Sequence, residues 1–139
     1  MTELVRDVMT PDPVSLPPDA SATEAARQMR DHDTGAILVV DGDDLAGIVT
    51  DRDIAVRAVA EGADPDDCRI GDICTPDPEA LAPDQPVEEA IRILRDRKVR
   101  RVPVVENGTP AGIVSIGDLA LVRDRDSALA DISAAPANN

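Results

Sequence analysis

The sequence lacks aromatic side chains altogether, with no Phe, Tyr or Trp among its 139 residues. Because hydrophobic residues still make up 42% of the chain, a buried core must be built from aliphatic side chains alone. Proteins that bind single-stranded nucleic acid stack the bases on aromatic rings, so this absence argues against such a function. The length otherwise fits one compact domain or two small halves that share a core.

Basic residues are scarce as well. Fourteen Lys and Arg face 28 Asp and Glu, which gives a formal net charge of −14 at pH 7. An acidic surface of this kind repels the phosphate backbone of nucleic acids and anionic lipid headgroups. We therefore expect neither a nucleic acid nor a membrane as partner.

The sequence also lacks long apolar runs and the basic, apolar start of a signal peptide. Its first residues read "MTELVRDVMTPDP", and no stretch approaches the roughly 18 apolar residues of a membrane span. We therefore expect a soluble, cytoplasmic protein.

Residues that carry metal or nucleophilic chemistry are few. Cys68 and Cys74 are separated by five residues and His32 is the one histidine, which supplies neither a CxxC pair nor four metal ligands. His32 has no evident Ser or Cys partner and the chain has no G-x-x-x-x-G-K phosphate loop, so an enzyme is not expected. We expect reduced, partly buried thiols; a redox role of Cys74 would require an exposed thiol of low pKa.

What the sequence does contain is a duplication, which decides the fold before any single element does. Val5 aligns with Ile70, and the same shift of 65 positions holds without a gap as far as Asp53 and Asp118. The matching stretches include "DVMTPDP" with "DICTPDP", "LPPD" with "LAPD", and "VVDGDDLAGIVT" with "VVENGTPAGIVS".

Each half shows the same series of elements. Residues 14–16 are predicted to be extended, and "PDASATEAARQMRDHD" has its apolar residues at helical spacing. The apolar runs "AILVV" and "LAGIVT" flank a turn with Gly42 and predict a hairpin. A second helix is predicted from Asp51 to about Glu61, where Gly62 stops it. The second half repeats this order with "VPVV", "PAGIV" and a helix from about Ile116.

We predict an α+β fold of two layers, in which each half reads strand, helix, strand, strand, helix. The first domain spans residues 5–62, a linker spans 63–69, the second domain spans 70–127, and a disordered tail spans 128–139. Neither half has enough core to be stable alone. The halves are therefore expected to pack sheet against sheet about a pseudo-two-fold axis.

Each half places a hydroxyl and an acid at its strand-to-helix junction, in "GIVTDRDI" and "GIVSIGDL". One reading is structural, because Thr50 with Asp53, and Ser115 with Asp118, have the spacing of a helix capping box. Asp is one methylene shorter than the usual Glu, so we expect it to reach back less easily and to leave its carboxylate pointing outward. The other reading is a ligand site, in which unpaired helix amides bind a phosphate and the carboxylate accepts two ribose hydroxyls.

These repeated motifs, with the "VPVVE" strand and the "TPDP" segments, make the chain similar to tandem pairs of CBS domains, named after cystathionine β-synthase. The similarity runs from Val5 to Val122 and extends to small stand-alone CBS-pair proteins of actinobacteria, the type that includes a hypoxic-response protein. It implies a regulatory, non-catalytic module that binds adenosine-containing ligands in two clefts between the repeats. The candidate ligands are AMP, ADP and ATP, then S-adenosylmethionine and NAD, with or without Mg²⁺; no further cofactor is implied.

The resemblance also implies which residues form the clefts, since the hydroxyl and acid of each repeat contact phosphate or ribose and the other repeat completes the cleft. The cleft of the first repeat's acid receives Thr50, Arg52, Asp53, Cys74, Pro78, Val99, Arg100 and Arg101. The cleft of the second repeat's acid receives Met9, Val14, Thr34, Gly35, Ala36, Ser115 and Asp118.

The two sets differ in charge. Arg100 and Arg101 would place guanidinium groups beside a phosphate, where they form strong bidentate hydrogen bonds, and Arg52 adds another. The second set has no such pair, so we predict that the Asp53 cleft binds the phosphate and that the Asp118 cleft is weak, empty or holds a less charged ligand. The alternative for "RDRKVRR" is a solvated basic helix end beside the negative end of the helix dipole, which leaves both arginines in water.

Two functions remain open. A sensor would bind adenine nucleotide and pass the change to a regulated protein of unknown identity or to its own dimer interface, because leftover apolar helix surface is expected to pair two chains. The alternative is a CBS-pair interaction or stress-response protein that does not bind nucleotide physiologically. In that case the repeated hydroxyl and acid only cap helices.

Overall fold

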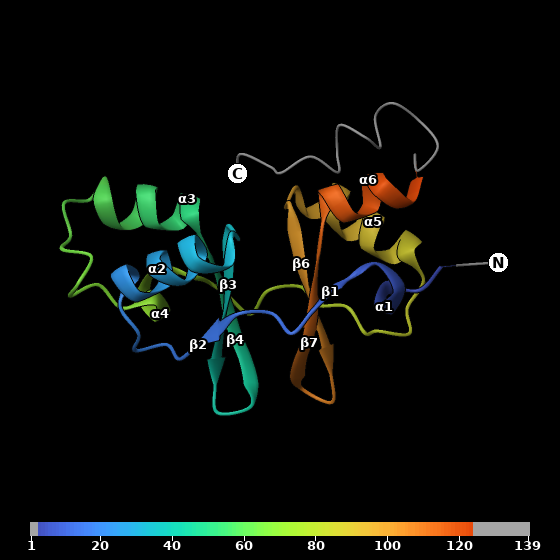
Figure 1. Cartoon of the computed structure of the whole chain (residues 1–139), viewed down its shortest axis with the longest axis horizontal. Coiled ribbons are helices and arrows are strands. Elements are labelled where there is room, and N and C mark those ends of the chain that lie inside the picture. Colours follow the sequence, from blue (N-terminus) through green and yellow to red (C-terminus); the bar gives the residue numbers. More distant parts are fainter. Residues whose placement is uncertain (1–2, 124–139) are drawn as a thin grey trace. The chain divides into compact units, whose positions relative to one another are not determined.

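The computed structural model describes residues 3–123, which form two compact units (Figure 1). We call residues 13–78 the central unit, and residues 3–12 together with 79–123 the terminal unit. The units differ from the two sequence repeats, because the first segment of each repeat packs with the later part of the other. The tail predicted to be disordered, residues 128–139, lies outside the described residues.

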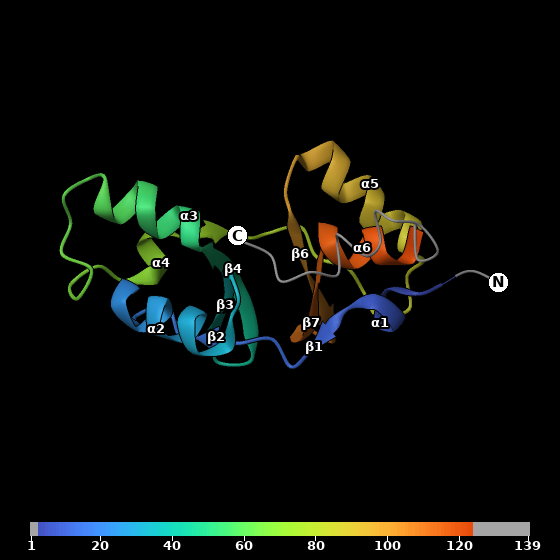
Figure 2. The ribbon, with the colours of Figure 1, turned by 45° about the horizontal axis from the view of Figure 1, so that its top comes forward.

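The central unit is a four-stranded sheet with helices on one face (Figures 1 and 2). Its strands lie in the order β2-β3-β4-β5; β2 runs parallel to β3, and the other two pairs are antiparallel. The strands are β2 (Ser15–Leu16), β3 (Ala36–Asp41), β4 (Asp44–Thr50) and β5 (Thr75–Pro76). The helices are α2 (Ala22–His32), α3 (Asp51–Asp53), the π-helix η1 (Ile54–Val59) that continues it, and α4 (Ile70–Ile73).

The terminal unit repeats this plan with a three-stranded sheet in the order β1-β7-β6. Where the central unit has β2, Leu81 forms a single parallel bridge to Val104. The strands are β1 (Thr10–Pro11), β6 (Arg101–Glu106) and β7 (Thr109–Ser115). The helices are α1 (Val5–Val8), α5 (Val87–Arg97) and α6 (Ile116–Arg123).

The predicted hairpins and long helices are confirmed in both units. In the central hairpin, Gly42 has φ of +66°, and the two strands close around a two-residue turn as expected for a glycine at its first position. The predicted stop at Gly62 is also confirmed, since its φ of +78° cannot continue a helix. The second helix changes from α to π geometry at Ile54, which periodicity alone does not predict.

Each unit buries an aliphatic core between its sheet and its helices, as the absence of aromatic residues requires. The central core consists of Ala22, Ala25, Met29, Ile37, Val39, Val49, Ala58, Ile70, Ile73 and Cys74. The terminal core consists of Val5, Leu81, Val87, Ala90, Ile93, Leu94, Val102, Val104, Val114 and Leu119.

The opening segments of the two repeats are exchanged between the sheets. Strand β1 of the first repeat pairs with β7, and β5 of the second repeat pairs with β4. The short helices α1 and α4, which the sequence did not predict, precede these strands. They bring Val5 and Ile70, each 0% exposed, into the core of the unit built mainly from the other repeat. Local pattern cannot predict this exchange, because segments of two to four residues show no periodicity.

Candidate functional site

The capping boxes predicted at both strand-to-helix junctions are present. The Thr50 hydroxyl accepts the amide N–H of Asp53 at 3.1 Å, and the Asp53 Oδ2 accepts the amide N–H of Thr50 at 2.9 Å. At the other junction the distances are 3.2 Å to the Ser115 hydroxyl and 2.9 Å to the Asp118 Oδ2. The expectation that the shorter acid would point outward is therefore wrong. The extended backbone of Thr50, with ψ of 165°, turns its amide toward the first turn, so an aspartate can reach it.

The first helix amides of the central unit are already paired, which corrects the expectation that they hold a phosphate. The amide of Asp51 donates to the Gly35 carbonyl at 3.0 Å, and the amide of Arg52 donates to the Asp51 carboxylate at 2.8 Å. The amide of Asp53 is taken by the capping hydroxyl. An anion at this junction would have to be bound by side chains.

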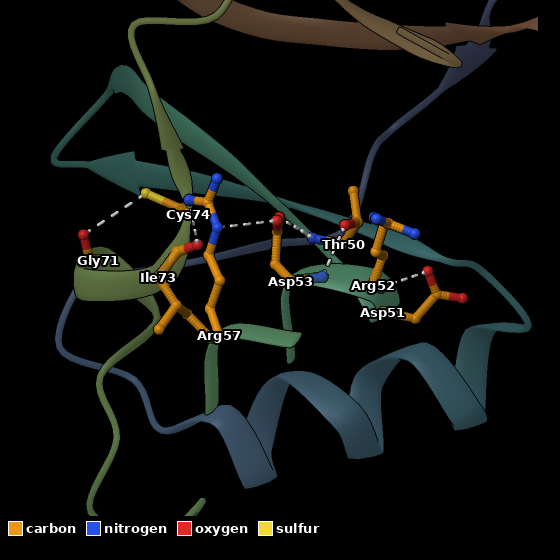
Figure 3. A network of polar contacts seen from close by, with 8 residues as sticks. All are labelled: Thr50, Asp51, Arg52, Asp53, Arg57, Gly71, Ile73 and Cys74. Carbon is orange, nitrogen blue, oxygen red and sulfur yellow. Dashed lines mark hydrogen bonds and ion pairs between the residues drawn. The ribbon is translucent and has the colours of Figure 1, made fainter. Parts of the chain in front are cut away.

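One oxygen of the Asp53 carboxylate stays available. No residue that the structure describes donates a hydrogen bond to Oδ1, although the side chain is only 13% exposed. Its neighbour is the Nε of Arg57, 3.8 Å away on the next turn of the helix (Figure 3). The carboxylate can therefore accept a further hydroxyl donor beside a guanidinium group.

Arg57 is a residue of this site that the sequence analysis missed. Its Nη1 donates a hydrogen bond of 3.2 Å to the Ile73 carbonyl at the end of α4 (Figure 3). Its side chain remains 53% exposed. The signal that could have found it is the four-residue spacing from Asp53, which favours an ion pair on a helix surface.

The predicted residues Cys74 and Pro78 lie in the same unit as Asp53. Cys74 is buried, and its thiol lies 3.6 Å from the Gly71 carbonyl (Figure 3). Burial raises the pKa of the Cys74 thiol, and the Asp53 carboxylate adds to the rise while Arg57 opposes it. Burial also raises the pKa of the half-buried Cys68 thiol. A redox role for Cys74 would need the opposite properties, so the structure does not favour it.

Four residues predicted for the cleft of Asp118 belong to the central unit. The Thr34 hydroxyl bonds to its own segment at Ala36, which pairs with Thr50 across the sheet. The Gly35 carbonyl accepts the amide N–H of Asp51, the first residue of α3, and the Val14 carbonyl accepts the amide N–H of Leu38 in β3. Thr34, Gly35 and Ala36 therefore adjoin the Thr50 and Asp53 cap within their unit. Their assignment to the cleft of Asp118 stays a prediction.

Three residues predicted for the cleft of Asp53, namely Val99, Arg100 and Arg101, belong to the terminal unit. Arg101 lies directly opposite Ser115 in the β6–β7 ladder, and the Arg100 carbonyl accepts the Ile116 amide at 3.0 Å. Val99 is 39% exposed beside them. Met9, predicted for the cleft of Asp118, lies in the same unit as Asp118 and packs against β7, where a Cβ on Gly112 would lie 2.6 Å from its sulfur; its assignment stays a prediction. Within the unit, Arg100 and Arg101 adjoin the start of the Ser115 and Asp118 cap, and the assignment of Val99, Arg100 and Arg101 to the cleft of Asp53 stays a prediction.

The basic run "RDRKVRR" divides into two groups. Arg95 and Arg97, on α5, pair with Asp96 and Glu79 at 3.7 and 3.2 Å, as expected of a solvated helix end. Arg100 and Arg101 have no ion-pair partner among residues 3–123. The second group therefore keeps its capacity for an anion.

Two absences in the described part of the chain bear on other classes of site. Among residues 3–123, no group of three His, Cys, Asp or Glu side chains is arranged to hold a metal ion. Within that range no helix is both long and apolar enough to cross a membrane.

Comparison with known proteins agrees with the duplicated architecture. The sequence profile of the CBS domain matches residues 5–59 and 70–124. The uncharacterised protein YlbB of Bacillus subtilis is 38% identical over 135 residues, which cover 93% of this chain and 90% of YlbB.

Two solved structures share the fold. The crystal structure of Hypoxic Response Protein I with two coordinated zinc ions has a TM-score of 0.78 and 32% identity, covering 85% of this chain and 97% of that one. The CBS domain pair of MJ0100, in complex with methylthioadenosine and S-adenosyl-L-methionine, has a TM-score of 0.81 and 27% identity, covering 88% and 97%. Because the family profile covers both repeats, this chain belongs to the CBS domain family and carries a tandem pair of CBS domains.

Proposed function

We propose that this protein is a regulatory module that binds an adenine nucleotide and performs no catalysis. The observation that carries the proposal is the Asp53 junction, where a free carboxylate oxygen lies 3.8 Å from a half-exposed guanidinium group. The complex of the related MJ0100 pair with two adenosine compounds supports the ligand class. The cytoplasmic location expected from the sequence stays a prediction.

The chemistry of binding follows from what the cap leaves free. The Asp53 Oδ1 can accept a ribose hydroxyl, as carboxylates do in other nucleotide-binding folds. Arg57 beside the Asp53 cap, and Arg100 and Arg101 beside the Ser115 cap, can supply charge-assisted hydrogen bonds for phosphate. With no aromatic ring in the chain, the adenine is held by aliphatic side chains and main-chain hydrogen bonds. We take AMP, ADP and ATP as the first candidates, with or without Mg²⁺, before S-adenosylmethionine and NAD.

Calorimetric titration of the nucleotide-stripped protein with these five compounds tests the proposal. We expect one equivalent to bind per chain, and Asp53→Ala to abolish binding. Asp118→Ala removes the same kind of cap in the other unit and is the matched comparison; we expect it to keep the binding. A thermal-shift assay should agree, because ligand at about 100 times its Kd adds about 2.7 kcal/mol to stability.

The outcomes separate the open alternatives. Loss of binding in Asp118→Ala, with binding kept in Asp53→Ala, would assign Arg100 and Arg101 to the cap of their own unit. No heat and no thermal shift with any compound would contradict the proposal. The alternative, an interaction or stress-response protein without physiological nucleotide binding, would then hold, and the two hydroxyl and acid pairs would serve as helix caps.

Homodimer formation is part of the proposed regulation, with a regulated protein as the further partner. Val56 and Val59 are 47% and 60% exposed on η1, and apolar side chains so placed favour burial against a second copy. We expect replacement of both by Asp to yield a monomer by light scattering, because unpaired carboxylates are costly to bury. Ala26→Asp, on the exposed face of α2, is the control and should leave the dimer intact. A double variant that remains dimeric would contradict this assignment.

A further inference from the structure

Arg57 links the Asp53 junction of its own helix to a segment of the central unit that is distant in sequence. It belongs to η1, its Nε faces the Asp53 carboxylate at 3.8 Å, and its Nη1 donates to the Ile73 carbonyl at 3.2 Å (Figure 3). Ile73 ends α4, in the segment that the second repeat contributes to this unit. One guanidinium group therefore connects the candidate ligand acid to the exchanged segment.

These two contacts leave the guanidinium group with donors to spare. A guanidinium carries five N–H donors, and one hydrogen bond to the described part of the chain is formed, by Nη1. The side chain is 53% exposed, so Nη2 and Nε can meet a ligand. The Asp53 Oδ1 beside it has no hydrogen-bond donor among residues 3–123. A cationic donor and an anionic acceptor thus lie side by side, which matches the phosphate and ribose hydroxyls of one nucleotide.

The arrangement occurs once in the duplicated sequence. The position 65 residues after Arg57 is Val122, which carries no charge. The Asp118 junction therefore has the same cap without this guanidinium group. The cations near the Asp118 junction, Arg100 and Arg101, come instead from the start of β6 and the residue before it. Since the chain as a whole carries a net charge of −14, a cation on the helix itself, 3.8 Å from the acid, favours an anion at the Asp53 junction.

We propose that Arg57 is a ligand-contacting and positioning residue of the Asp53 site, which binds a phosphate oxygen and ties the bound nucleotide to α4 and β5 through the Ile73 carbonyl. The inference rests on the proposed function and adds a route for regulation. A bound phosphate restricts the Arg57 side chain and so holds its bond to Ile73 in place. Occupancy of the site then stabilises the pairing of β5 with β4 and keeps Cys74 covered.

Cys74 provides a readout of this coupling inside the native protein. It lies between α4 and β5, next to Ile73, and is 8% exposed. In a Cys68→Ser background, the rate at which a thiol reagent modifies Cys74 reports the opening of this segment. The ratio of the rates without and with nucleotide is compared between variants, because a change in the thiol pKa that the substitution itself causes affects both rates.

The experiment uses AMP, ADP and ATP as probes and four proteins: the parent, Arg57→Gln, Arg57→Lys and the control Arg30→Gln. Arg30 lies on α2 in the same unit and pairs with its neighbour Asp31, so the control removes the same charge elsewhere. In the parent and the control, nucleotide should slow modification of Cys74. Arg57→Gln should weaken binding by about 10-fold to 100-fold, the loss typical of a hydrogen bond to a charged group, and abolish protection even at saturation.

Arg57→Lys keeps the charge but cannot bind phosphate and the Ile73 carbonyl in the same geometry, so we expect partial affinity without protection. If Arg57→Gln does not fold, Arg57→Lys alone decides, and protection of Cys74 equal to the parent in Arg57→Lys would overturn the inference. Nucleotide binding and protection equal to the parent in Arg57→Gln would overturn the inference while the proposed function stands. A parent protein that binds none of the three nucleotides would overturn both.

Discussion

Replacing Ile70 by alanine should lower the free energy of unfolding of the central unit by about 2–5 kcal/mol, the usual cost of truncating a fully buried isoleucine. Ile70 is 0% exposed and packs in the core that also holds Ala22, Ala25 and Ala58. Its amide donates to the Ala20 carbonyl at 2.9 Å, so the backbone there cannot easily collapse into the cavity. The effect should appear in the unit built mainly from the first repeat, although Ile70 opens the second.

Hydrogen exchange followed by segment measures this directly. In Ile70→Ala, amides of α2, β3 and β4 should exchange faster, while those of α5, β6 and β7 keep their protection. Val5→Ala is the matched variant, because Val5 holds the equivalent position of the first repeat and is buried in the terminal core. It should show the reverse pattern. Faster exchange confined to the terminal unit in Ile70→Ala would mean that the opening segments are not exchanged.

Gly47→Ala is the second large effect that we expect, a loss of about 1–3 kcal/mol from overpacking. A Cβ on Gly47 would lie 2.7 Å from the Sγ of Cys74 and 2.8 Å from the carbonyl oxygen of Thr75. A backbone oxygen cannot rotate away as a flexible side chain can. Strand β5 would therefore have to leave β4, with loss of the pairing between Ile48 and Thr75.

Release of β5 should also make Cys74 reactive toward a thiol reagent in a Cys68→Ser background. Gly112→Ala is the matched control, because its Cβ would meet Met9 and Thr10 in the terminal unit at 2.6 and 2.8 Å. That variant should destabilise its own unit and leave the reactivity of Cys74 unchanged. An unaltered melting temperature and unaltered Cys74 reactivity in Gly47→Ala would show that the sheet tolerates the added methyl group.

The duplication made most of the fold predictable. A gap-free repeat places each turn and each apolar run twice, so the hairpins and helices of the two halves support one another. The hydroxyl and acid of each junction were found for the same reason. The details of the caps were not, because the reach of an aspartate depends on the backbone angles at Thr50 and Ser115 rather than on side-chain length alone.

The exchange of β1 and β5 could not be read from the sequence, since two-residue strands gain their stability from the sheet that they join. Arg57 shows a similar limit. Its spacing from Asp53 predicts an ion pair, but its bond to the Ile73 carbonyl depends on α4 lying against η1. Contacts between segments distant in the chain have no local sequence signal.

The sequence by itself determined the family, the duplicated α+β elements, the aliphatic core and the two hydroxyl and acid pairs, because these depend on composition and on spacing along the chain. Only the tertiary structure decided which sheet each opening segment joins, which amides are already paired, and which carboxylate oxygen remains free beside Arg57. The physical reason is that hydrogen bonds are used up by partners brought together in folding, and a binding site consists of the donors and acceptors that folding leaves unused.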